Sequence, residues 1–217
     1  MRVRHIKNIE NKFEILKKKY NFIENESFYI GKWKEIFFNK NPIHIELGCG
    51  KGNFIVNISK KYRNINFVGI EKDKNILYKA LLNSENQKNL FFILTDIKDI
   101  NKVFKKNEIN RIYINFPDPW PKNKHEKRRL TNKFFLDIYK NILKKNGEIF
   151  FKTDNLNLFN YTLKFFITDS NWIVKNLFIN YNTNIFKNFF IDEITEYEEK
   201  YKKLNKPIFK LHLINSK

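Results

Sequence analysis

The feature that most limits the fold of this chain is an alternation of short apolar runs with helical patterns from residue 43 onward. The strand-like runs are 43–47, 66–71, 90–95, 111–115 and 148–153, and the helical patterns are 53–61, 74–84, 132–143 and 156–167. Such a rhythm is typical of a parallel sheet with helices packed on it. The sequence therefore predicts an α/β fold.

The two ends of the chain depart from this alternation. Residues 9–20 have apolar side chains at helical spacing and lysines on the other face, which predicts an amphipathic helix in a basic N-terminal extension of about residues 1–40. After Trp172 the pattern weakens into an irregular stretch and ends in a strand-like run at 208–214. Since we find no internal repeat and no linker rich in Pro, Gly or Ser, we predict a single domain over residues 1–217.

The composition is that of a folded and very basic protein. Of 217 residues, 42 are Lys or Arg and 23 are Asp or Glu, which gives a formal net charge of +19, and 42% are hydrophobic. The charge alone carries little weight, because a general bias toward Lys, Asn, Ile and Phe contributes to it. No apolar run approaches the ~18 residues of a membrane span, the start lacks a secretory pattern, and Cys49 is the only cysteine. We expect a cytoplasmic protein without an internal disulfide or a cysteine-based metal cage.

A glycine-rich loop follows the first apolar run, at the point where a strand opens into a helix. Gly48, Gly50 and Gly52 fall within five residues, directly after Glu46 and Leu47. Doubly wound sheets bind nucleotide-like ligands at such a loop, where glycine lets the backbone turn tightly and approach the ligand.

Carboxylates end the strands around this loop. Glu71 ends the second run, 23 residues after Gly48 and close to the spacing of ~20 that suits a residue holding ribose hydroxyls, and Asp96 follows the third run. The loop is Gly-x-Gly-x-Gly rather than the Gly-x-Gly-x-x-Gly of dinucleotide-binding loops. A pyrophosphate is thus a poorer fit than a ligand with positive charge, and S-adenosylmethionine, with its sulfonium, amino group and ribose, matches. The alternative is a tight turn with incidental acids, which the agreement of the three features disfavours.

A second loop concentrates three of the five prolines. Residues 117–121 read Pro-Asp-Pro-Trp-Pro and follow the run 111–115, so a stiff loop lies at the carboxyl edge of the sheet, where a substrate base would meet the methyl group. The cations that follow are Lys122, Lys124, Lys127, Arg128 and Arg129. We expect them to contact RNA phosphates. The alternative is a solvated charge run, which we prefer for other lysine clusters such as 17–19; here the arginine pair and the rigid loop favour RNA.

These motifs resemble the bacterial tRNA (guanine-N7)-methyltransferase family over nearly the whole chain. The resemblance rests on Met1-Arg2-Val3-Arg4-His5, Gly31-Lys32-Trp33, the glycine loop, Phe116-Pro117-Asp118-Pro119-Trp120-Pro121-Lys122, His125-Glu126-Lys127-Arg128-Arg129, Lys152-Thr153-Asp154 and Thr195-Glu196-Tyr197-Glu198. The glycine loop alone would indicate only a Rossmann-type methyltransferase, whereas the combination is specific. The one departure, Cys49 between the glycines, is small enough to leave the turn intact.

The resemblance implies a Rossmann-like class I S-adenosylmethionine-dependent methyltransferase with a doubly wound, mostly parallel sheet and helices on both faces. The implied reaction is methyl transfer to N7 of the variable-loop guanine of tRNA (position 46 in tRNA convention). Asp118 would be the catalytic residue, and the cofactor would be held by Glu46, Gly48, Gly50, Gly52, Glu71, Asp96 and Asp118. The substrate would be held by Lys122, Asp154, Thr195, Glu196, Tyr197 and Glu198, and RNA would be contacted by Lys124, His125, Glu126, Lys127, Arg128 and Arg129. The expected partner is tRNA, with no membrane and no metal; monomer and homodimer both stay open.

The chemistry of guanine fits these residue types. N7 has an in-plane lone pair and no proton to lose, so catalysis should consist mainly of positioning and charge stabilisation rather than proton abstraction. A carboxylate such as Asp118 can stabilise the positive charge that moves into the purine ring. The N1–H and the exocyclic amino group are adjacent donors, for which Glu196, Glu198 and Asp154 are the candidate acceptors.

Three other functions compete with this one. A methyltransferase for another base or for a protein would keep the glycine loop without needing residues 195–198. A Rossmann oxidoreductase would show Gly-x-Gly-x-x-Gly, which is absent from the sequence. A non-catalytic RNA-binding module would use the basic surface alone.

Overall fold

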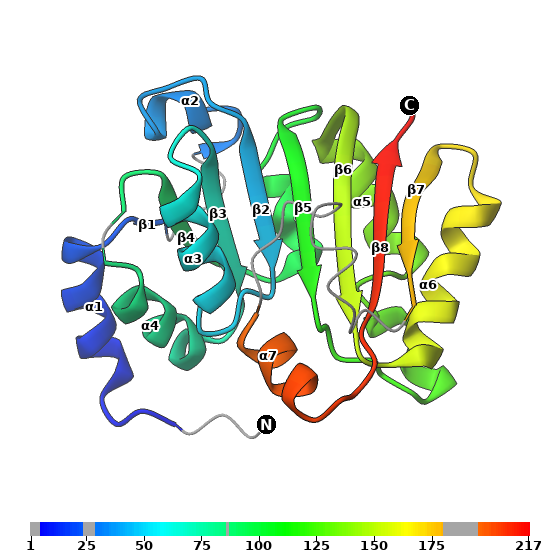
Figure 1. Ribbon diagram of the computed structural model, residues 1–217. Coiled ribbons are helices and arrows are strands. Elements are labelled where there is room, and N and C mark those ends of the chain that lie inside the picture. Colours follow the sequence, from blue (N-terminus) through cyan, green and yellow to red (C-terminus); the bar gives the residue numbers. More distant parts are fainter. Residues whose placement is uncertain (1–4, 24–28, 86, 180–194) are drawn as a thin grey trace. The chain divides into compact units, whose positions relative to one another are not determined.

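The computed structural model describes residues 5–23, 29–85, 87–179 and 195–217, without the side chains of Glu196 and Lys202 (Figure 1). The chain divides into two compact units, an N-terminal unit of residues 1–105 and a C-terminal unit of residues 106–217. Within the described part of the chain, every helix is too short or too polar to cross a membrane.

Parallel strands form the centre of the N-terminal unit. They are β1 (Phe22–Ile23), β2 (Ile43–Leu47), β3 (Asn66–Glu71) and β4 (Leu90–Leu94), in the order β1-β4-β3-β2. Leu47 lies opposite Ile70, and Glu71 lies opposite Leu94, so β2, β3 and β4 end at the same edge. These three strands confirm the predicted runs. The two-residue β1 was not predicted, because so short a strand has no readable periodicity.

The helices of this unit are α1 (Ile9–Lys19), α2 (Trp33–Ile36), α3 (Asn53–Lys61), α4 (Lys74–Asn83) and the 3₁₀ helix η2 (Ile97–Lys102). The predicted amphipathic helix is confirmed by α1, which buries Ile9, Phe13 and Leu16. The start of α4 is set by Asp73, whose carboxylate accepts hydrogen bonds from the N–H groups of Asn75 and Ile76 at 2.8 and 3.1 Å.

The C-terminal unit mixes parallel and antiparallel strands. They are β5 (Ile109–Asn115), β6 (Leu143–Thr153), β7 (Trp172–Phe178) and β8 (Phe209–Asn215), in the order β5-β6-β8-β7. β5 and β6 are parallel, whereas β8 is antiparallel to both β6 and β7. The last strand thus lies between two strands that precede it in the sequence, an arrangement that the local pattern did not reveal.

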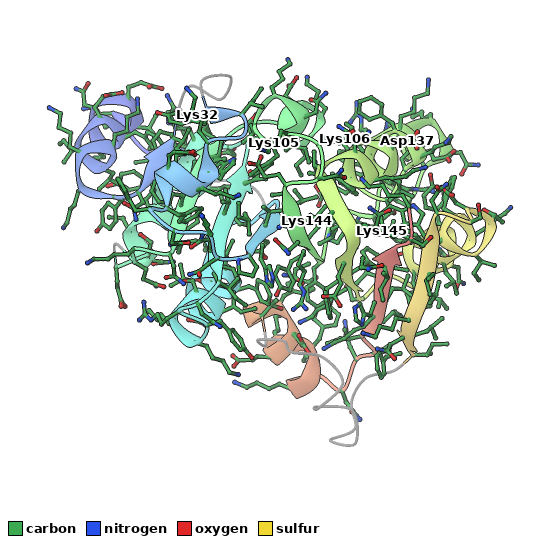
Figure 2. All side chains as sticks on the ribbon, turned by 90° about the horizontal axis from the view of Figure 1, so that it is seen from above. Lys32, Lys105, Lys106, Asp137, Lys144 and Lys145 are labelled. Carbon is green, nitrogen blue, oxygen red and sulfur yellow. The ribbon has the colours of Figure 1, made fainter. Side chains whose placement is uncertain are left out.

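The helices of this unit are η3 (Asn123–Arg128), α5 (Lys133–Ile142), α6 (Leu156–Thr168) and α7 (Glu196–Lys203). α7 corrects the sequence interpretation, which described its residues as irregular; its segment is dominated by charged and tyrosine side chains and has no apolar stripe. At the amino ends of β5 and β6, Lys106, Lys144 and Lys145 lie far from the loop that follows β5 (Figure 2).

The two faces of the C-terminal sheet differ in polarity, because successive side chains on a strand point to opposite faces. One face is apolar, with Phe151 beside Leu211, and α6 packs on it through Phe159 against Phe209. The other face has polar groups, listed here by strand: Arg111 on β5, Glu148 and Lys152 on β6, Lys210 and His212 on β8. Burial alone would raise the pKa of Glu148, but the His212 hydrogen bond and the Arg111 charge lower it to about 2.

Candidate functional site

The glycine loop leaves β2 with three left-handed residues. Gly48, Gly50 and Gly52 have φ angles of 68°, 58° and 78°, a region that costs other residues about 1–2 kcal/mol each. A Cβ on Gly48 or Gly50 would meet no atom within 4 Å, so open space adjoins the loop there. A Cβ on Gly52 would lie 3.0 Å from the Cβ of Ala80 on α4. The first two glycines therefore expose backbone to a ligand, and the third lets α3 pack closely on α4.

Three predicted carboxylates stand at the ends of the adjacent strands β2, β3 and β4. Glu46 is buried on β2, and Glu71 and Asp96 are half-buried. The Glu71 carboxylate is held by backbone donors: Oε2 accepts from the N–H of Gly50 at 3.2 Å, and Oε1 accepts from the N–H groups of Lys72 and Asp73 at 2.9 and 3.0 Å. Glu71 is thus linked directly to the glycine loop before any ligand binds.

Asp96 caps the 3₁₀ helix after β4, where its carboxylate accepts from the N–H of Lys98 at 3.1 Å. Cys49 is buried within the glycine loop, and burial, with the nearby Glu46 and Glu71 charges, raises the pKa of its thiol well above the usual value. Since the thiolate is the reactive form, Cys49 is a small packing residue there.

The proline-tryptophan loop of the C-terminal unit begins and ends with strained residues. Phe116 and Trp120 have φ angles of 48° and 41°, although neither is glycine. The N–H of Phe116 donates to the carbonyl of Lys152 at 2.8 Å. Asp118 lies between the two strained residues and is exposed. Backbone strain of this kind persists only where the surroundings hold it, and it is common at functional sites.

The basic segment after this loop divides into exposed and engaged residues. Lys122, Lys124, Lys127 and Arg128 are exposed, with the guanidinium of Arg128 4.9 Å from the Trp120 ring. Arg129 is half-buried, donates two hydrogen bonds to the Trp120 carbonyl at 3.2 and 3.1 Å, and lies 4.3 Å from the Tyr161 ring.

Two further residues predicted to contact RNA are half-buried beside this loop. The ring of His125 meets the Trp120 ring edge-on at 5.6 Å. Glu126 accepts a hydrogen bond from the Tyr161 hydroxyl at 2.8 Å. Burial, followed by this bond, raises the pKa of Tyr161 to about 12. In this geometry Glu126 and Arg129 hold the loop, and Lys124, Lys127 and Arg128 are the groups that face solvent.

The late Thr-Glu-Tyr-Glu motif opens α7 beside the carboxyl ends of β5 and β6 (Figure 1). Thr195 is buried, and its Oγ1 accepts from the N–H of Glu198 at 2.9 Å. The side chain of Glu196 lies outside the described residues. Tyr197 is 42% exposed, and its ring lies 4.9 Å from the Phe116 ring.

Glu198 occupies a different position from that of a substrate ligand. Its side chain is 0% exposed, and its two oxygens accept from Lys152 at 3.0 Å and from Lys210 at 2.9 Å. Burial alone would raise the pKa of Glu198, but the two lysine charges lower it to about 2. The carboxylate is therefore a buried ion, neutralised by the protein.

Asp154, which follows β6, is half-buried and hydrogen-bonds to Tyr201 of α7. Bonds with Tyr197, in first place, and with Asp154 raise the pKa of Tyr201. Among the described carboxylates of this motif group, Asp154 is the one that is not fully buried. It is thus the better acceptor for a guanine edge.

Sequence reasoning missed the two buried lysines as site residues. A usable signal existed, because Lys152 and Lys210 each interrupt an apolar run and a lysine is almost never buried without a partner. Across the described ranges, no group of three or more His, Cys, Asp or Glu side chains could hold a metal ion.

Comparison with known proteins agrees with this architecture. A family model described as "Putative methyltransferase" matches residues 40–211. A tRNA (guanine-N(7)-)-methyltransferase of Brevibacillus brevis is 38% identical over 213 residues, covering 97% of each chain, and one of Oceanobacillus iheyensis is 44% identical over 186 residues, covering 83% of this chain and 84% of its own.

Among solved structures, a 16S rRNA (adenine(1408)-N(1))-methyltransferase of Catenulisporales acidiphilia superposes with a TM-score of 0.61 at 10% identity, over 85% of this chain and 92% of that one. At that identity the likeness concerns the fold, which is the Rossmann-like class I methyltransferase fold with a mostly parallel sheet. By its near-full-length identity to curated relatives, the chain belongs to the tRNA (guanine-N(7)-)-methyltransferase family.

Proposed function

We propose that this protein is an enzyme that transfers the methyl group of S-adenosyl-L-methionine to N7 of a guanine in tRNA. The observation that carries the proposal is the identity of 38–44% to relatives named for this reaction, over 83–97% of the chain. The variable-loop guanine is the position we infer, and the cytoplasm is the location. The residue assignments below belong to the same proposal.

The residues of the N-terminal unit suit S-adenosylmethionine. The space beside Gly48 and Gly50 admits a ligand against bare backbone, and the acidic groups Glu46, Glu71 and Asp96 favour a cation. A related fold, a variant of the rRNA methyltransferase above, is described with the cosubstrate SAM. When bound, this group supplies an electrophilic methyl on a positively charged sulfur.

The residues of the C-terminal unit suit a guanine. Asp118 is an exposed carboxylate in a loop held at both ends, so it can stabilise positive charge in the purine without large reorganisation. Asp154 can accept from the Watson–Crick edge, and the exposed ring of Tyr197 offers a surface on which an unstacked base can lie. No strong base is required, since N7 has no proton.

The direct test is transfer of tritium from labelled S-adenosylmethionine to unmodified bulk tRNA, followed by mapping of the labelled base. We expect the label at N7 of a variable-loop guanine. Label at another base would redirect the proposal to a different RNA methyltransferase, and absence of label with all RNAs would favour a non-catalytic RNA-binding protein.

The division of the basic segment predicts different salt dependences for its members. Replacing Lys124, Lys127 or Arg128 singly by Ala should weaken tRNA binding and make the slope of log K against log salt shallower, by up to ~0.9 per phosphate on a duplex and ~0.7 on a single strand. Arg129→Ala should leave the slope nearly unchanged, because its guanidinium is engaged by Trp120 and Tyr161.

The control is Lys18→Ala, an exposed lysine on α1. The measurement is tRNA binding by fluorescence anisotropy from low to high salt. Slopes that stay at the wild-type value for all three exposed cations would mean that this segment is only a solvated charge run.

A further inference from the structure

We propose that Glu198 is a positioning residue, which anchors α7 on the sheet so that Tyr197 holds Phe116 and thereby the loop that carries Asp118. The proposal rests on the proposed function, in that Asp118 serves methyl transfer. It differs from the family resemblance, which implies that Glu198 holds the substrate.

The anchor is a buried group of three charges. Lys152 on β6 and Lys210 on β8 lie opposite each other in the register, and their side chains are 1% and 2% exposed. Glu198 bridges them with one oxygen to each ammonium. Removing the carboxylate would leave two buried positive charges side by side, which is strongly unfavourable. We call Lys152, Glu198 and Lys210 the buried triad.

The buried triad fixes the start of α7. The N–H of Glu198 donates to Oγ1 of Thr195, and the N–H of Glu199 donates to the Thr195 carbonyl at 3.0 Å, so the first turn is closed around the anchored carboxylate. With both oxygens engaged and no exposed surface, Glu198 has no atom to offer a substrate. Its effect on the reaction must pass through its neighbours.

The neighbour that reaches the catalytic loop is Tyr197. Its ring lies 4.9 Å from the Phe116 ring and 4.6 Å from the Tyr201 ring, and its hydroxyl lies 3.0 Å from that of Tyr201. Tyr201 is in turn bonded to Asp154. The two tyrosines thus form an aromatic row that starts on Phe116, two residues before Asp118.

Phe116 needs such support. A left-handed φ of 48° costs a side chain of this kind about 1–2 kcal/mol, so the conformation must be imposed by contacts. Two contacts impose it: the Tyr197 ring, and the hydrogen bond from its N–H to the Lys152 carbonyl. Both lead back to the buried triad, because Lys152 is a member of it and Glu198 follows Tyr197. The geometry makes the triad the common foundation of the strained loop.

Glu198→Gln tests this role, with Glu199→Gln as the matched control, since Glu199 is an exposed glutamate on the same helix. We expect single-turnover methyl transfer at saturating enzyme to fall about tenfold to a hundredfold in Glu198→Gln, the range for a misplaced catalytic group. Cofactor affinity by calorimetry should stay within about twofold of wild type, since the cofactor residues other than Asp118 lie in the N-terminal unit. Glu199→Gln should have near-normal rates.

Trp120 reports the loop itself. With 5-fluorotryptophan incorporated, the free protein should give a fluorine signal for each of Trp33, Trp120 and Trp172, with the Trp120 signal assigned by Trp120→Phe. In Glu198→Gln we expect the Trp120 signal to shift or broaden while the buried Trp33 and Trp172 signals stay in place. A lower rate with an unchanged Trp120 signal would overturn the proposal and make Glu198 a substrate ligand.

If Glu198→Gln fails to fold, Tyr197→Leu decides, because it leaves the buried triad intact and removes the ring from Phe116. The Trp120 signal should move in this variant too, and an unmoved signal would overturn the proposal. The fluorine measurement uses protein without RNA, so it stands even if the methyl acceptor proves not to be guanine N7. Failure of tritium transfer in the wild-type protein would instead refute the proposed function.

Discussion

Asp118→Asn is expected to lower single-turnover methyl transfer by about a hundredfold to a thousandfold, the usual cost of one preorganised electrostatic contact. Asparagine keeps the size of the side chain and loses its full negative charge. If Asp118 acts on charge that develops in the purine, the rate should fall far more than the affinity for cofactor or tRNA. The measurement is tritium transfer in a single turnover with enzyme saturating over tRNA, alongside both binding constants.

Asp137→Asn is the matched control, because Asp137 is an exposed aspartate in the same unit, on α5, paired with Lys133 at 3.3 Å (Figure 2). It should have wild-type rates. Near-normal rates for Asp118→Asn would remove the electrostatic role and leave Asp118 as a residue that shapes the loop between Phe116 and Trp120.

Glu71→Ala is expected to weaken cofactor binding by about tenfold to 150-fold, the equivalent of ~1.5–3 kcal/mol for a hydrogen bond to a charged group. The structure adds a second reason for a large effect. The Glu71 carboxylate accepts from the N–H of Gly50 and from two N–H groups after β3, so its removal also loosens the glycine loop. Calorimetric titration with S-adenosylmethionine measures the change.

The affinity for tRNA should change little in Glu71→Ala, because the proposed RNA contacts lie in the other unit. Glu14→Ala removes an equal charge from the exposed surface of α1 and should have no effect on the cofactor. Cofactor affinity at the wild-type level in Glu71→Ala would contradict the assignment of Glu71 to the ribose.

Much of the N-terminal unit could be predicted from its sequence, because its elements follow from local forces. Apolar runs of five or six residues bounded by turns became β2, β3 and β4. The glycine spacing predicted a backbone that only glycine adopts easily, and the three positive φ angles confirm that geometry. The prediction of a single domain with a basic N-terminal extension stays a prediction, as do the assigned site residues.

Less of the C-terminal unit could be predicted, because its features depend on residues far apart in the chain. Nothing local marks β8 for a place between β6 and β7, since strand order is set by how the whole unit buries its apolar face. The role of Arg129 changed for a similar reason: a guanidinium in a basic run looks solvated until Tyr161, on another helix, covers it.

The sequence by itself determined the fold class, the glycine loop, the stiff Asp118 loop and the family, because each depends on a short stretch of residues whose chemistry is readable in order. The tertiary structure alone decided what Glu198 does. Its partners lie 46 residues before it and 12 residues after it, and their charges become strong only after the strands pair and exclude water. A carboxylate that the motif assigned to the substrate is therefore an internal ion, because desolvation and pairing are properties of the folded chain.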